Sequence, residues 1–167
     1  QAQRVVAVEL DQRLIPALEH VISPFSNVQI IQGDILQVNL TQIMQKPGYL
    51  VVANIPYYIT SNLIRQLLET QMAPRRLVLT VQSEVATRIC AEPGEMSLLA
   101  ISVQVYGKPE ISTHIPAEAF YPSPKVDSAV VCVELYPEAL IDPKILKTFF
   151  TLAKAGFSQK RKTLRNA

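Results

Sequence analysis

Short apolar runs alternate along the chain with longer segments in which apolar residues recur every three or four positions. Runs of the first kind are typical of buried strands, and the second spacing is typical of helices that pack one face against a core. The runs predict strands at 5–8, 28–31, 49–53, 76–81, 110–115 and 128–135. The helical spacing predicts helices at 11–21, 40–44, 60–71, 84–90 and 143–155, whereas 97–106 fits a helix or a strand.

Residues at the predicted helix starts support these boundaries. Asp11, and either Thr60 or Ser61, can accept a hydrogen bond from a first-turn N–H, as N-cap residues do. Pro143 suits the first position of a helix, because an N–H at that position would have no partner within the helix. The helix that begins near Thr60 is expected to turn these apolar side chains inward: Leu63, Ile64, Leu67 and Leu68.

The alternation of strands and helices predicts an α/β fold with a mostly parallel sheet, and the last two strands are expected to form an antiparallel pair at one edge. The chain has 167 residues, of which 49% are hydrophobic, enough for one sizeable core and an appendage. Because the chain opens on Gln1 and runs almost at once into a strand, we expect it to be a fragment.

Composition indicates the cellular location and the kinds of site to expect. No apolar run is long enough to span a membrane and no secretory leader opens the chain, so we expect a cytoplasmic protein, without a membrane partner. Cys90 and Cys132 lie far apart in apolar segments without metal-ligand spacing, which predicts reduced core residues and no metal site. The net charge is only +2, yet the last stretch is rich in bases, which suits either phosphate contacts or a solvated tail.

Polar residues follow the first three predicted strands. Glu9, Asp34 and Asn54 come at or just after strand ends, where ligands of parallel α/β sheets bind. A carboxylate there can accept two hydrogen bonds from ribose hydroxyls, although such residues also serve as helix caps or turn residues. The succession of all three favours a shared cofactor site.

The segment 54–61 carries the most specific chemistry. Asn54 offers a carbonyl acceptor, and Pro56 restrains the backbone so that a neighbouring peptide carbonyl can point the same way. Two acceptors can hold both hydrogens of an aromatic amine and favour the geometry in which its lone pair attacks. Tyr57 supplies a ring on which a base can stack. The alternative is an ordinary strand-to-helix turn in which Tyr57 packs inward.

Three motifs carry a resemblance to a known family. Asn54-Ile55-Pro56-Tyr57 resembles motif IV of the S-adenosylmethionine-dependent adenine-N6 methyltransferases. The segments 120–128 (Phe-Tyr-Pro-Ser-Pro-Lys-Val-Asp-Ser) and 157–164 (Phe-Ser-Gln-Lys-Arg-Lys-Thr-Leu) are similar to two motifs of the ribosomal RNA adenine dimethyltransferases. The chain therefore resembles the small-subunit, kasugamycin-resistance type of that family, as a fragment without its glycine-rich cofactor loop and most of its C-terminal domain.

The resemblance implies a Rossmann-like methyltransferase core at 1–136 and the start of a helical RNA-binding domain at 137–167. It implies S-adenosylmethionine as cofactor and small-subunit ribosomal RNA or an immature small subunit as partner, with a monomeric enzyme active in ribosome biogenesis. The implied catalytic residues are Asn54, Pro56, Tyr57 and Phe120, with Tyr57 and Phe120 on either side of a flipped adenine. The implied cofactor-binding residues are Glu9, Leu10, Asp34, Ile35 and Asn54. The implied RNA-binding residues are Lys125, Lys160, Arg161 and Lys162.

Two alternatives stay open at this point. A large-subunit adenine methyltransferase of the macrolide-resistance type shares the Asn54 motif, although segments 126–128 and 157–164 favour the small-subunit enzyme. A relative that binds RNA as an assembly or transcription factor is the other alternative. Ser83 stands where the family commonly has lysine, and the fragment itself is expected to bind cofactor poorly.

Overall fold

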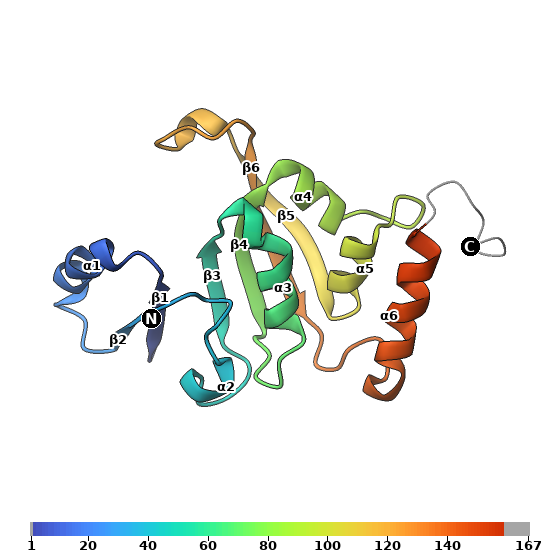
Figure 1. The fold of residues 1–167 in the computed structure, drawn as a ribbon, viewed down its shortest axis with the longest axis horizontal. Coiled ribbons are helices and arrows are strands. Elements are labelled where there is room, and N and C mark those ends of the chain that lie inside the picture. The colour runs from blue at the N-terminus through green and yellow to red at the C-terminus, as the bar shows by residue number, and fades with distance from the viewer. Residues whose placement is uncertain (1, 159–167) are drawn as a thin grey trace. The chain divides into compact units, whose positions relative to one another are not determined.

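The computed structural model describes residues 2–158. The chain folds into two compact units, Gln1–Lys46 with Thr70–Met72, and Pro47–Glu69 with Ala73–Ala167. Figure 1 shows the elements of both units in chain order, coloured from blue to red. The domain boundary expected between 136 and 137 stays a prediction.

The first unit is built around a pair of parallel strands. Its elements are β1 (Val5–Glu9), η1 (Gln12–Leu14), α1 (Ile15–Ile22), β2 (Val28–Gln32) and α2 (Leu40–Ile43). Strands β1 and β2 pair from Val5 opposite Val28 to Glu9 opposite Gln32, as the apolar runs predicted. Both strands therefore end at the same edge of the pair. Glu9 is the last residue of β1, and Asp34 follows the end of β2.

The start of α1 differs from the prediction. Asp11 does accept a hydrogen bond from the Arg13 N–H, at 2.9 Å, but it caps the short 3-10 helix η1. The α-helix begins only at Ile15, followed by Pro16 in its first turn. Proline lacks an N–H and cannot continue a hydrogen-bonded helix from the preceding turn, so it marks a new helix start.

The second unit contains a four-stranded sheet. Its elements are β3 (Leu50–Asn54), η2 (Tyr57–Ile59), α3 (Thr60–Leu68), β4 (Arg76–Gln82), α4 (Ser83–Ile89), α5 (Leu98–Gln104), β5 (Gly107–Ile115), η3 (Ala117–Ala119), β6 (Ser128–Leu135) and α6 (Pro143–Phe157). The strand order is β3-β4-β6-β5; β3 and β4 are parallel, and β6 is antiparallel to both β4 and β5. The predicted antiparallel pair at one edge is confirmed, and so is the mixed α/β class.

The core of this unit lies on one face of the sheet. In β4, alternate residues Leu77, Leu79 and Val81 are at most 1% exposed, and their register partners on β6 are also buried. Helices α3, α4 and α5 group on one side of the sheet in Figure 1. The inward residues predicted for α3, namely Leu63, Ile64, Leu67 and Leu68, are all buried.

The capping prediction for α3 is wrong. Thr60 is the first helical residue and is buried at 2% exposure, and the N-cap position belongs to Ile59, which has no side-chain cap. The preceding 3-10 turn supplies the missing acceptors, since the Ile59 N–H bonds to the Pro56 carbonyl and the Thr60 N–H to the Tyr57 carbonyl. Thr60 has helical dihedral angles (φ −50°, ψ −52°), because η2 runs directly into α3, whereas an N-cap residue is typically extended.

The end of α3 also comes earlier than predicted. The helix stops at Leu68 instead of about 71. The Thr70 hydroxyl accepts the Met72 N–H at 3.1 Å, a local turn that competes with helix continuation. The ambiguous segment 97–106 is a helix, α5, capped by the Ser97 hydroxyl on the Ala100 N–H.

Within residues 2–158, no helix is long and apolar enough to cross a membrane.

Candidate functional site

Asn54 is the last residue of β3 and its side chain is exposed. Its backbone is fixed by the parallel pairing with Thr80 of β4, and the next N–H, that of Ile55, donates to the Thr80 carbonyl at 3.2 Å. Among the described residues, the Asn54 amide has no hydrogen-bond partner. The strand thus presents an amide whose acceptor and donors are free for a ligand.

The two backbone carbonyls after Asn54 differ in their hydrogen bonds. The Pro56 carbonyl accepts the Ile59 N–H at 3.1 Å and so belongs to the turn. The Ile55 carbonyl accepts no backbone hydrogen bond in the described part of the chain. Of these two carbonyls, that of Ile55 is the one left as an acceptor beside Asn54, but Ile55 is only 2% exposed.

Tyr57 lies in the 3-10 turn η2 and is half-buried. Its hydroxyl forms a 2.8 Å hydrogen bond with the Ser128 hydroxyl, the first residue of β6. Tyr57 therefore packs partly inward, as the structural alternative proposed, while part of its surface stays accessible. The neighbouring Tyr58 is 81% exposed.

Phe120 lies in the segment between β5 and β6, which projects from the sheet in Figure 1. It is half-buried, and its N–H donates to the Ala117 carbonyl at 3.2 Å. Asp127 holds this segment at its base, since one carboxylate oxygen accepts the Ala117 N–H at 2.9 Å. The Asp127 carbonyl accepts the Ser83 N–H at 2.9 Å, which joins the same point to the start of α4.

Glu9 and Asp34 lie at or just after the ends of the two paired strands of the first unit. Gly33 donates its N–H to the Glu9 carbonyl at 2.9 Å, which brings the chain before Asp34 to the end of β1. One Glu9 oxygen accepts the Asp11 N–H at 2.7 Å, and one Asp34 oxygen accepts the Leu36 N–H at 2.9 Å. Both residues thus serve in turns, as the alternative interpretation held.

The turn roles leave ligand-binding capacity. In the part of the chain that the structure describes, the second oxygen of each carboxylate has no protein donor, and both side chains are half-buried. Two acceptors at the carboxyl ends of parallel strands fit the ribose and amino donors of a nucleoside cofactor. Leu10 beside Glu9 is 62% exposed and Ile35 beside Asp34 is half-buried, so both can contribute apolar surface.

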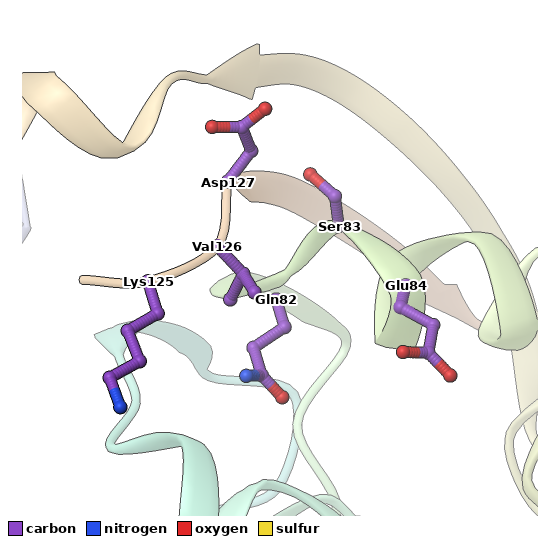
Figure 2. Close-up of a pocket in the computed structure, with 6 residues that line it drawn as sticks. All are labelled: Gln82, Ser83, Glu84, Lys125, Val126 and Asp127. Atoms are coloured by element: carbon purple, nitrogen blue, oxygen red, sulfur yellow. The ribbon is translucent and has the colours of Figure 1, made fainter.

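A hollow of about 350 Å³ lies between the start of α4 and the end of the β5–β6 segment. Its lining residues, shown in Figure 2, are Gln82, Ser83, Glu84, Lys125, Val126 and Asp127. Lys125 and Gln82 point the same way, whereas Asp127 points in the opposite direction. Lys125 is exposed, so its predicted RNA contact is sterically open. Lys160, Arg161 and Lys162 lie outside the described residues.

Both cysteines are free, as predicted. Each is half-buried, however, and not enclosed in the core. Burial raises the pKa of the Cys90 thiol, and the negative charge of Glu110 raises it further. The thiolate is the nucleophilic form of cysteine, so a raised pKa disfavours a nucleophilic role for Cys90. Residues 2–158 contain no group of three His, Cys, Asp or Glu side chains able to hold a metal ion.

Comparison with known proteins places this geometry in context. The chain is 45% identical to a ribosomal RNA small subunit methyltransferase A of Dehalococcoides mccartyi, over 100% of the chain and 58% of that protein. The chain thus spans less than two thirds of the length of that relative.

Solved structures show the same fold. A crystal structure of a dimethyladenosine transferase from Plasmodium falciparum matches 99% of the chain and 59% of its own length, with a TM-score of 0.86 and 27% identity. The 23S rRNA methyltransferase ErmE matches 99% of the chain and 66% of its own length, with a TM-score of 0.82; at 24% identity it supports the fold alone. The model of the ribosomal RNA adenine dimethylase family matches residues 1–167, and the chain therefore belongs to this family.

Proposed function

We propose that the protein containing this chain transfers methyl groups from S-adenosylmethionine to N6 of adenines in small-subunit ribosomal RNA, giving N6,N6-dimethyladenosine. The observation that carries this proposal is the free, exposed amide of Asn54 at the end of β3, followed by a 3-10 turn with a half-buried tyrosine. Family membership over the whole chain supports the same reaction. The 45% identity to a small subunit methyltransferase supports the small-subunit substrate.

The cofactor-binding residues of the chain are Glu9 and Asp34, with Leu10 and Ile35 beside them. Glu9 accepts hydrogen bonds from ribose hydroxyls and Asp34 from the adenine amino group, each through the oxygen that its turn leaves free. S-adenosylmethionine, when bound, supplies a methyl group already activated on a sulfonium. Because of this activation, the protein contributes mainly positioning and electrostatic support.

Asn54 acts on the target amine. The lone pair of an aromatic amine is delocalised into the ring, which makes the amine a poor nucleophile. Its hydrogens bind to the Asn54 side-chain oxygen and to a neighbouring backbone carbonyl, and the Ile55 carbonyl accepts no backbone hydrogen bond among the described residues. These bonds strengthen as the nitrogen becomes pyramidal, so they lower the barrier more than they improve ground-state binding.

Tyr57 and Phe120 provide aromatic surfaces for the adenine. A base that reacts must leave its stack, which costs a few kcal/mol, and stacking on an aromatic side chain returns roughly 1–3 kcal/mol. Both residues are half-buried and so stay partly accessible, and the Tyr57 hydroxyl is held by Ser128. Lys125 and the cluster Lys160, Arg161 and Lys162 bind RNA phosphates in this proposal.

In vitro methylation tests the proposed substrate. The protein containing this chain would be incubated with labelled S-adenosylmethionine and either transcribed small-subunit RNA, immature small subunits or large-subunit RNA, and modified adenines would be mapped by mass spectrometry. We expect N6,N6-dimethyladenosine in the small-subunit samples. Methylation confined to large-subunit RNA would identify a macrolide-resistance type of enzyme, and RNA binding without methylation would favour an assembly factor.

A further inference from the structure

The hydrogen bond between Tyr57 and Ser128 joins positions 71 residues apart in the sequence. Ser128 is 0% exposed and lies where β6 pairs on both sides, opposite Gln82 of β4 and Ile115 of β5. A central strand paired along both edges is a rigid support. The hydroxyl of Ser128 is thus a fixed point against which the Tyr57 ring is held.

The other end of Tyr57 is fixed by its backbone. Pro56 precedes it with φ of −54°, and the Tyr57 carbonyl accepts the Thr60 N–H at the start of α3. Fixing the Cα and the hydroxyl at opposite ends of the side chain restricts both its χ1 rotation and the tilt of the ring. Tyr58, in the same turn, has no hydroxyl partner among the described residues and is mostly exposed.

We propose that Ser128 is a positioning residue, which sets the orientation of the Tyr57 ring as the stacking surface for the target adenine. This inference rests on the proposed function, because it concerns the residue that receives the base. A ring of fixed tilt places the amine at one position relative to Asn54, and small displacements of a reacting group are costly. Loss of the bond leaves stacking possible at several tilts, so it lowers the rate of reaction more than the affinity for RNA.

The test compares Ser128→Ala, Tyr57→Phe and the double variant in the protein containing this chain. Tyr57→Phe removes the same bond without altering β6. If one variant fails to fold, the other still tests the bond. We expect each single variant to lower kcat by about 5- to 10-fold, since one neutral hydrogen bond is lost. KM for RNA is expected to stay within about 2-fold, and the double variant is expected to be no slower than the singles.

Two control variants show whether the loss of any hydroxyl lowers kcat, or only the loss of the bond that positions Tyr57. Ser102→Ala removes a hydroxyl that bonds only to the Leu99 carbonyl of its own helix, at 2.8 Å. Tyr106→Phe removes a buried hydroxyl that has no partner among the described residues. Both control variants are expected to retain the wild-type kcat.

A second measurement does not depend on activity. In protein with 13C-labelled tyrosine, Ser128→Ala is expected to shift the Tyr57 ring resonances and leave those of Tyr58 in place. Unchanged Tyr57 resonances, an unchanged kcat, or a double variant that loses the product of the two single effects would overturn the inference. A wild-type protein that methylates no RNA, with Tyr57 resonances that do respond, would refute the proposed function instead.

Discussion

Replacing Asn54 by alanine is expected to lower kcat for adenine methylation by about 100-fold or more, the typical cost of one lost transition-state hydrogen bond in a preorganised site. The Asn54 side chain is exposed at the end of β3 and bonds to no described residue, so the change removes a ligand contact and no fold contact. The effect is expected in kcat, because the bond strengthens only as the amine becomes pyramidal. Single-turnover methylation of small-subunit RNA measures it.

Asn27→Ala is the matched control for this variant. Asn27 is an exposed asparagine before β2, and within residues 2–158 its side chain bonds only to the Ala2 carbonyl, at 2.9 Å. Its replacement is expected to leave kcat within about 2-fold of wild type, as for a surface change away from the site. If Asn54→Ala kept methylation within about 3-fold of wild type, the amine-binding role of Asn54 would be wrong.

Replacing Leu79 by alanine is expected to lower the free energy of unfolding by about 2–5 kcal/mol. Leu79 is 1% exposed in the middle of β4, between Ala53 of β3 and Val131 of β6. Its side chain fills the core beneath the helices, and neighbours on paired strands cannot close the cavity that alanine would leave. Urea unfolding followed by circular dichroism measures the change.

Leu152→Ala provides the comparison for the core. Leu152 lies on α6 and is 64% exposed, so the same truncation there is expected to change the free energy of unfolding by no more than about 0.5 kcal/mol. Equal effects at Leu79 and Leu152 would contradict the location of the core on this face of the sheet.

The sequence pattern predicted the order and type of the elements well, because each strand and helix carries its own periodicity. Strand β6 begins and ends where the apolar run does, and α6 begins at Pro143, as predicted. Two of the errors, at the starts of α1 and α3, fall where a 3-10 helix runs directly into an α-helix. The type of residue at Thr60 suggests a cap, yet the preceding 3-10 turn already gives Thr60 the dihedral angles of a helical residue.

The candidate site could be predicted in its ligand-facing residues but not in its supports. Asn54, Tyr57 and Phe120 could be predicted from local motifs, because a few consecutive residues are enough to indicate their chemistry. The contact of Tyr57 with Ser128 depends on which strand lies beside β4, and that is set by tertiary pairing. Segment 126–128 resembles a family motif, but that resemblance does not predict the hydrogen bond between Ser128 and Tyr57.

Glu9 and Asp34 show how two interpretations can both hold. Each residue was expected either to bind a cofactor or to stabilise a turn, and the structure confirms the turn role for one oxygen of each carboxylate. A carboxylate has two oxygens, and the orientation fixed by the first leaves the second for a ligand. Cofactor binding by these residues stays a prediction that calorimetry with S-adenosylmethionine would measure.

The central claim is dimethylation of small-subunit RNA, and nucleoside mass spectrometry of ribosomal RNA from the source organism tests it most directly. Deletion of the gene is expected to remove N6,N6-dimethyladenosine from small-subunit RNA. The wild-type gene is expected to restore it, and the Asn54→Ala gene is not. Small-subunit RNA that keeps its dimethyladenosine after deletion, or a loss confined to large-subunit RNA, would contradict the proposed function.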